Sequence, residues 1–179
     1  MGTDKSLLNY HGKPQRYYLV DLLRPFCKAV FISCNEKQDA EIPTVYQTIP
    51  DSGLYADIGP MASLLSAFDL LPNENFLVIG CDYPFTEATH IRQLAEARAG
   101  FDAVCFKHGD ILEPLVALYC SSSRPKLVSA FKKGNFSLRH FLGEINTLSI
   151  QPEETGFLRS VDDESGYRKA LQEIAGKAR

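Results

Sequence analysis

The chain has 179 residues, of which 45% are hydrophobic and 23% are charged, with a formal net charge of −3. This size predicts a single globular domain over residues 1–179, because a chain of this length can bury most of the surface that it exposes when unfolded. The mild acidity gives no reason to expect general binding to nucleic acid or to a membrane surface, and no stretch approaches the ~18 consecutive apolar residues of a membrane span.

The five cysteines predict a reducing compartment. Their number is odd, no CxxC pair occurs, and most of them stand in apolar runs: Cys27, Cys34, Cys81, Cys105 and Cys120. Disulfide frameworks and zinc sites need paired cysteines at regular spacing. We therefore expect reduced core thiols, and with no signal-peptide pattern after Met1 we expect a cytoplasmic protein.

Helical and strand patterns alternate along the chain. After a polar, glycine-bearing opening over residues 1–13, a helix is expected at 14–24, a strand at 29–33, a turn-rich loop at 50–60, a helix at 60–71, a strand at 76–82, a helix at 87–99 capped by Thr86, and strands at 102–106 and 114–120. Such alternation predicts an α/β, Rossmann-like fold with a mainly parallel sheet and helices on both faces.

The stretch "FLVIGCDYPF" (76–85) is an apolar run that ends at Asp82. A short continuous apolar run is typical of a buried parallel strand, and ligands bind outside the carboxyl ends of such strands. Asp82 is therefore a candidate ligand for Mg²⁺, which takes one or two carboxylates together with phosphate oxygens. The alternative is a cap for the next helix.

Three further residues are candidates for nucleotide binding, each with a simpler alternative. Lys5 is suited to a phosphate, although most lysines are solvated. Asp51 can accept two hydrogen bonds from a guanidine-like edge, or form a turn with Ser52. Gly59 allows a backbone to approach a ligand closely, or serves only its turn. The basic stretch 125–140 is either a solvated helix face or a docking surface for a phosphorylated second substrate.

Five segments in the same order resemble the molybdenum cofactor guanylyltransferases, also called molybdopterin-guanine dinucleotide synthases. They are "MGTDKSLLNYHGKP", "DIGPMASLLSAF", "CDYPF", "EPLVALY" and "GNFSLRHFL". The resemblance covers residues 1–142 and is weak over 143–179. It implies a nucleotide-transferase fold, and an enzyme that transfers GMP from GTP to the terminal phosphate of the molybdenum-bearing pterin and releases pyrophosphate.

The resemblance also implies roles for residues. Lys5 is expected to contact the GTP phosphates, Asp51 the guanine, and Asp82 the Mg²⁺. Ser33 or Asn35 stands where the family has a base-contacting asparagine, Gly59 belongs to the GTP site, and Asp162 falls on an asparagine position near the metal. Expected partners are GTP, the molybdopterin-type cofactor, and proteins that insert the cofactor into molybdoenzymes.

The sequence also departs from the family. Members open with a strand and a glycine-rich "LAGGxSxR" loop, and the match of this chain to the family starts at Met1, directly after that loop. We therefore expect about 15 to 20 further residues before Met1 in the natural protein. Ser63 replaces a glycine, Glu113 a glutamine, and "SVDD" (160–163) the motif "NxNT". The alternatives are a CTP-using pterin or sugar-phosphate nucleotidyltransferase, and a catalytically silent nucleotide-fold binding module.

Overall fold

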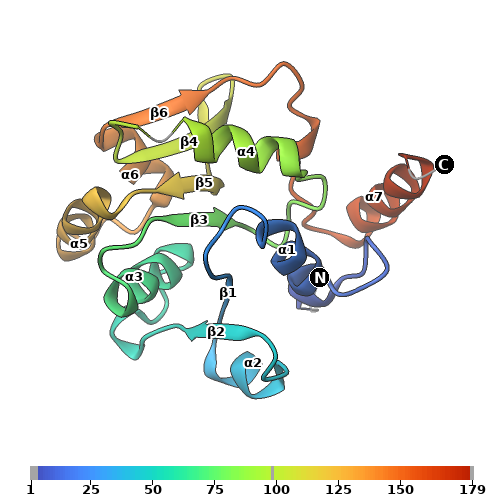
Figure 1. The fold of residues 1–179 in the computed structure, drawn as a ribbon, viewed down its shortest axis with the longest axis horizontal. Helices are drawn as coiled ribbons and strands as arrows, with labels where there is room; N and C mark the ends of the chain where they lie inside the picture. Colours follow the sequence, from blue (N-terminus) through green and yellow to red (C-terminus); the bar gives the residue numbers. More distant parts are fainter. Residues whose placement is uncertain (1–3, 98, 178–179) are drawn as a thin grey trace.

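The computed structural model describes residues 4–97 and 99–177, in which helices and strands alternate (Figure 1). The strands are β1 (Phe31–Cys34), β2 (Gln47–Pro50), β3 (Phe76–Ile79), β4 (Ala103–His108), β5 (Ile111–Tyr119) and β6 (Thr147–Ile150). The α-helices are α1 (Gln15–Leu23), α2 (Glu36–Glu41), α3 (Pro60–Leu70), α4 (Ala88–Glu96), α5 (Arg124–Lys132), α6 (Leu138–Glu144) and α7 (Glu164–Lys177). Short 3₁₀ helices include η1 (Lys5–Leu7) and η4 (Gly156–Leu158).

The strands of the described residues form two sheets. One is the parallel pair β1–β2, and the other has the order β3-β5-β4-β6. In Figure 1 the second sheet runs upward from β3 to β6, with the β1–β2 pair below it. Within the described residues, the edges of β1 and β3 that lie away from β2 and β5 carry no strand partner.

The α/β class with helices on both faces is confirmed, but the expectation of a mainly parallel sheet is wrong. β5 runs antiparallel to both β3 and β4, whereas β4 and β6 are parallel. The cause is a two-residue hairpin, since His108 pairs with Ile111 across Gly109 and Asp110, and Gly109 has a φ of 59°. Strands joined by so short a loop must be antiparallel, and Gly-Asp suits the positive φ of such a turn.

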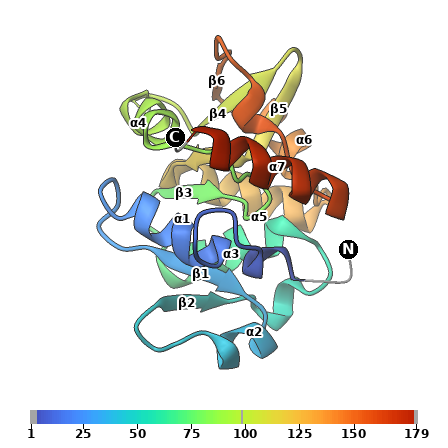
Figure 2. The same ribbon diagram turned by 90° about the vertical axis from the view of Figure 1, so that its right-hand side faces the viewer.

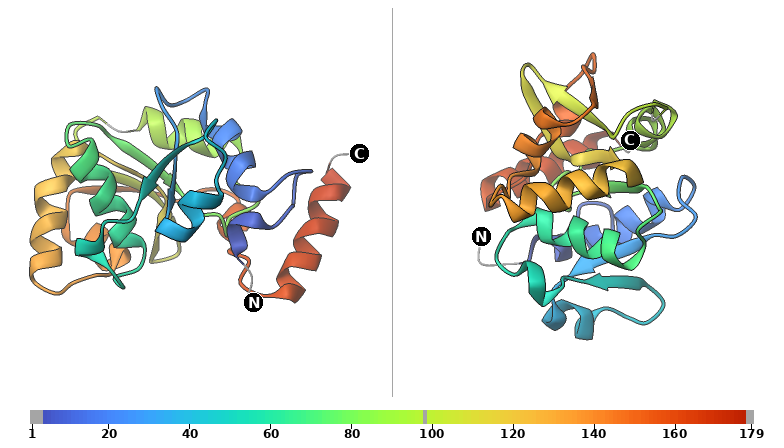
Figure 3. Two further views of the ribbon diagram at one scale, coloured as in Figure 1. Left: turned by 90° about the horizontal axis from the view of Figure 1, so that it is seen from below. Right: turned by 90° about the vertical axis from the view of Figure 1, so that its left-hand side faces the viewer.

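Alternate residues of the larger sheet pack into two separate hydrophobic layers, one on each face of the sheet. Ala103, Cys105, Ala117 and Tyr119 face α3, α5 and α6. Val104, Phe106, Val116 and Leu118 face α4, η4 and α7. This is the two-residue period of a strand buried on both faces. Figure 2 and the left view of Figure 3 show α7 crossing one side of the molecule beside the amino-terminal segment, where the Tyr10 and Tyr167 rings meet edge to face at 5.0 Å.

Local sequence explains where the main helices begin. Pro60 is the first residue of α3, and Pro14 is the N-cap of α1. Proline fits a first helical turn because its missing N–H has no partner there in any case. None of the helices in the described part of the chain combines the length and the apolar character that crossing a bilayer requires.

Candidate functional site

Lys5 lies in η1, a single turn that Asp4 caps by accepting a hydrogen bond from the Ser6 N–H at 2.9 Å. The Lys5 ammonium donates to Oδ1 of Asp162 at 2.6 Å. The two side chains are 35% and 67% exposed, and so exposed an ion pair contributes only about 0–1 kcal/mol to stability. The pair therefore matters mainly because it places a cation and a carboxylate at one point on the surface.

Asp82 follows β3, and its carboxyl group lies close to this pair. Burial raises its pKa, while a hydrogen bond from its own backbone N–H and the charge of Lys5 lower it, and Asp162 raises it. The next helix, α4, has Glu87 as its N-cap. Asp82 is therefore not the cap of that helix, and the simpler alternative for this residue is excluded.

The backbone ties Asp162 to Asp82. The Val161 N–H donates to the Asp82 carbonyl at 2.9 Å, and the Ser160 hydroxyl donates to Oδ2 of Asp162 at 2.8 Å. The hydrogen bond from Lys5 is the main reason that the pKa of Asp162 lies below its usual range. The structure thus brings three predicted residues together: Lys5, Asp82 and Asp162.

These residues fit a magnesium ion that is shared with phosphate. The described residues contain no group of three or more His, Cys, Asp or Glu side chains that would enclose a metal without other ligands. Mg²⁺ is instead commonly bound by one or two carboxylates, waters and substrate phosphates. Asp82 and Asp162 provide two such carboxylates, and Lys5 provides a cation for the phosphates.

A second cluster lies at the ends of β1 and β2. Asp51, which comes directly after β2, accepts hydrogen bonds on Oδ1 from Ser63 at 2.9 Å and from Ser33 at 3.3 Å. Its N–H donates to the Cys34 carbonyl at 2.8 Å. Ser33 and Asp51 therefore lie in contact. Ser63, in the first turn of α3, was not a predicted site residue. The only sequence indication of its role was that it replaces a glycine that is usual in the family.

Asn35 has a defined structural role. It caps α2, where its Oδ1 accepts from the Gln38 N–H at 2.9 Å and the Gln38 side chain accepts from the Asn35 N–H at 3.1 Å. The Gln38 amide also donates to Asp4 at 2.7 Å. Because Asp4 caps the turn that carries Lys5, this chain of hydrogen bonds joins the end of β1 to the first cluster, which consists of Lys5, Asp82 and Asp162.

Arg16 lies near the carboxyl ends of β1 and β3. Its positive charge lowers the pKa of Asp4, Cys34 and Cys81. Burial dominates for both thiols, and raises the pKa of Cys34 to about 11 and that of Cys81 to about 12. Arg16 is 6% exposed, so these two strand ends lie around one buried guanidinium group.

Gly59 has φ 64° and ψ −146° and is the residue before the first turn of α3. Only glycine adopts this backbone conformation without strain. The turn alone therefore requires a glycine, and nothing lies within 4 Å of the position of its missing Cβ.

The basic stretch is largely paired with acidic groups. Lys126 binds Asp102 at 2.5 Å, and His140 lies 3.2 Å from Glu144. Arg139 lies 3.9 Å from Glu113 and donates to the Leu112 carbonyl at 2.9 Å. This pairing favours a solvated, structural helix face over a docking surface for an anion.

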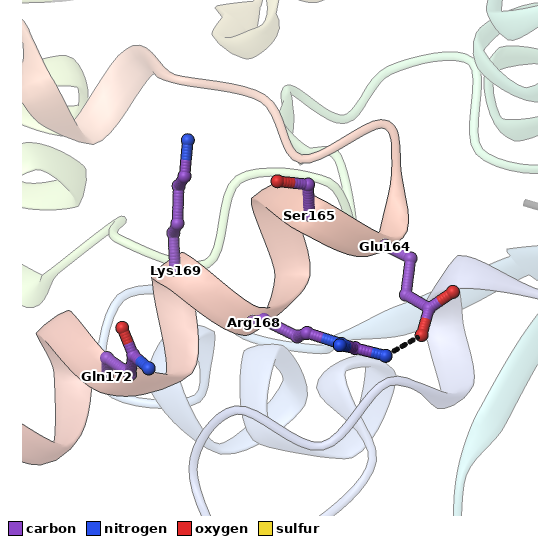
Figure 4. A pocket seen from close by; sticks show the side chains of 5 residues that line it. All are labelled: Glu164, Ser165, Arg168, Lys169 and Gln172. Atoms are coloured by element: carbon purple, nitrogen blue, oxygen red, sulfur yellow. Dashed lines mark hydrogen bonds and ion pairs between the residues drawn. The ribbon is translucent and has the colours of Figure 1, made fainter.

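A shallow depression on α7 lies outside these clusters (Figure 4). It is lined by five residues of that helix alone: Glu164, Ser165, Arg168, Lys169 and Gln172. Arg168 binds Glu164 at 2.5 Å one turn away. This is a paired, solvated helix face and not part of the site.

Known proteins resemble this chain in sequence and in fold. A bifunctional molybdenum cofactor biosynthesis protein of Synechocystis is 37% identical over 112 residues, 62% of this chain and 32% of its own length. A molybdenum cofactor guanylyltransferase of Pseudomonas fluorescens is 27% identical over 153 residues, 84% of this chain and 76% of its own length.

Solved structures show the same fold. Molybdopterin-guanine dinucleotide biosynthesis protein A of Archaeoglobus fulgidus superimposes with a TM-score of 0.78 at 23% identity, over 98% of this chain and 92% of its own. A 2-C-methyl-D-erythritol 4-phosphate cytidylyltransferase of Thermus thermophilus gives 0.72 at 14% identity, over 96% and 94%.

The family model of the MobA-like NTP transferase domain matches residues 1–148, which include both clusters except for the loop that carries Asp162. The chain therefore belongs to the MobA-like NTP transferase family.

Proposed function

We propose that this protein is a molybdenum cofactor guanylyltransferase, which transfers GMP from GTP to the terminal phosphate of the molybdenum-bearing pterin. The observation that carries the proposal is that the ion pair of Lys5 and Asp162 lies near Asp82, which follows β3. Family membership and the guanylyltransferases among the relatives support the same activity.

In this reaction an oxygen of the pterin phosphate attacks the α-phosphorus of GTP. A new phosphoanhydride bond forms, the bond from the α-phosphorus to the bridging oxygen breaks, and pyrophosphate leaves with the electron pair. The attacking oxygen is already anionic, so no general base is needed. Catalysis of this kind depends on positioning and on the neutralisation of phosphate charge.

Mg²⁺ would supply the divalent charge that binds the phosphates, and Asp82, assisted by Asp162, would hold it. Lys5 would move from Asp162 to the triphosphate, because a triphosphate offers its ammonium a larger negative charge. Asp162 would then be available to help Asp82 hold the metal. The exposed Lys5–Asp162 pair costs little to break.

Asp51 is proposed to recognise guanine. A carboxylate accepts two hydrogen bonds from the adjacent N1–H and N2–H groups of guanine, a pair of donors that cytosine lacks. Ser33 and Ser63 both donate to Oδ1 of Asp51, and so hold the carboxylate at the end of β2. Asn35 and Gly59 complete the proposed nucleotide site.

Two rival functions remain to be separated by experiment. One is a CTP-using nucleotidyltransferase acting on the pterin or on a sugar phosphate, and the other is a silent nucleotide-binding module. Binding of GTP, CTP and ATP should be measured by calorimetry with Mg²⁺. We expect GTP to bind most tightly and pyrophosphate to be released when the pterin is present; a preference for CTP would favour the first rival, and binding of GTP without release of pyrophosphate would favour the second.

A further inference from the structure

Gly80 comes directly after the last residue of β3 and precedes Asp82 by two positions. Its N–H donates to the Leu115 carbonyl at 2.8 Å, which extends the pairing of β3 with β5 by one residue. Its carbonyl accepts from the Tyr83 N–H at 3.2 Å. The backbone of Gly80 is therefore held on both sides and cannot shift freely.

A side chain at this position would crowd two neighbouring side chains. A Cβ on Gly80 would lie 2.5 Å from Oδ1 of Asp82, and 3.1 and 3.2 Å from two ring carbons of Tyr83. Favourable contacts between such atoms lie at about 3.5–4.0 Å. Gly80 is not among the described residues with positive φ, so the requirement for glycine here concerns space and not backbone conformation.

Of these two side chains, that of Tyr83 is held more firmly in place. Its side chain is buried, and its hydroxyl donates to Oε1 of Glu113 at 2.6 Å. Glu113 in turn lies 3.9 Å from Arg139. Asp82 carries a short side chain at a strand end, so a methyl group at position 80 would displace the carboxylate.

We propose that Gly80 is a positioning residue for metal binding, because its missing side chain leaves the space in which the Asp82 carboxylate lies. This inference rests on the proposed role of Asp82. Gly80 contacts no substrate and acts only through the position of that carboxylate. The same space would be filled by any other residue, so the requirement is for glycine alone.

The test is the substitution Gly80→Ala, with Mn²⁺ as a spectroscopic replacement for Mg²⁺. Binding of Mn²⁺ is measured by electron paramagnetic resonance in the presence of a GTP analogue with a methylene group between the α- and β-phosphorus atoms. We expect Mn²⁺ affinity to fall at least about tenfold, the scale seen when groups that orient metal ligands are lost. Affinity for the analogue in EDTA should not change.

Two further variants make the result specific. Gly143→Ala is the matched control, since nothing lies within 4 Å of the corresponding position in α6, and it should bind Mn²⁺ like the wild type. Asp82→Asn should lose Mn²⁺ affinity, and adding Gly80→Ala to it should cause no further loss. Additive losses would mean that Gly80 does not act through Asp82.

The outcomes separate this inference from the proposed function. If Asp82→Asn weakens Mn²⁺ binding and Gly80→Ala does not, only the inference is wrong. If the wild type and Asp82→Asn bind Mn²⁺ equally, the metal-binding role itself is wrong and the inference falls with it. If Gly80→Ala does not fold, the double variant Gly80→Ala/Asp82→Ala should fold, because it lacks the carboxylate that the new methyl group crowds. If that double variant also fails to fold, the inference is wrong.

Discussion

Lys5 and Asp162 are 157 positions apart in the sequence, and their side chains meet with 2.6 Å between Nζ and Oδ1. The contact joins the first helical turn of the described chain to the loop before α7. It also brings both charges close to Asp82, whose pKa responds to each of them. A change at any one of these three residues should therefore alter the charge that the site presents to a phosphate or a metal ion.

The substitution Asp82→Asn should nearly abolish transfer while the fold stays intact. It keeps the size of the side chain but removes the charge that would hold Mg²⁺, and we expect kcat/KM to fall at least about a hundredfold, as for other losses of electrostatic stabilisation. Pyrophosphate release measures the activity, and circular dichroism checks the fold. Near-normal turnover by the folded variant would show that Asp82 does not hold the metal.

The substitution Lys5→Met should separate function from stability. The ion pair with Asp162 is exposed, so its loss should change the free energy of unfolding by less than about 1 kcal/mol. A charge-assisted hydrogen bond to phosphate contributes more, and GTP affinity should fall about tenfold to a hundredfold. Calorimetry and urea unfolding give the two numbers. A variant that loses stability but binds GTP normally would show that Lys5 stabilises the fold and does not bind the phosphates.

The substitution Asp51→Ala should weaken GTP binding more than CTP binding. Leaving the N1–H and N2–H groups of bound guanine without an acceptor costs about 1–3 kcal/mol, which corresponds to roughly a tenfold to a hundredfold loss. Ser63→Ala should show the same preference at a smaller size, because Ser33 still donates to the carboxylate. Equal losses for both nucleotides would refute the contact with guanine.

The substitution Asp102→Asn should destabilise the fold and alter its dependence on pH. Asp102 is buried, and although burial alone raises its pKa, hydrogen bonds from Lys126, Ser122 and the Asn146 N–H bring the pKa below its usual range. Such a group stabilises the fold at pH values above its unfolded pKa of about 3.9, and this stabilisation is lost as the pH falls through the folded pKa.

Urea unfolding of the wild type and of Asp102→Asn should therefore differ by about 2–4 kcal/mol at pH 7, and the difference should shrink below about pH 4. The exposed Asp110 provides the control, since Asp110→Asn should leave stability unchanged. A difference that stays constant down to pH 3 would mean that the charge of Asp102 is not what stabilises the fold.

Local sequence was sufficient to predict the elements that carry strong signals. Pro14 and Pro60 mark the starts of α1 and α3, and the apolar run ending at Asp82 marks β3. β2 and β6 were not predicted, because each has only four residues and mixes polar with apolar side chains. The reversed direction of β5 depends on the two-residue hairpin at Gly109 and Asp110, which is a sequence signal for an antiparallel pair.

The site was predictable only in part. Asp82 and Asp51 stand at strand ends, where position alone suggests a ligand. The contacts of Asp162 with Lys5 and of Ser63 with Asp51 join distant segments, and no local pattern encodes such pairs. The lack of space for a side chain at Gly80 beside Asp82 likewise depends on the three-dimensional structure of the strand end and cannot be read from the sequence.

Transfer of GMP to the pterin can be followed through the α-phosphate of GTP. The purified protein is incubated with Mg²⁺, the molybdenum-bearing pterin cofactor and GTP labelled with ³²P at the α-phosphorus. We expect the label to move to the pterin product while an equal amount of pyrophosphate is released, and we expect α-labelled CTP and ATP to transfer little. Label that remains in GTP, or that moves more readily from CTP, would contradict this expectation.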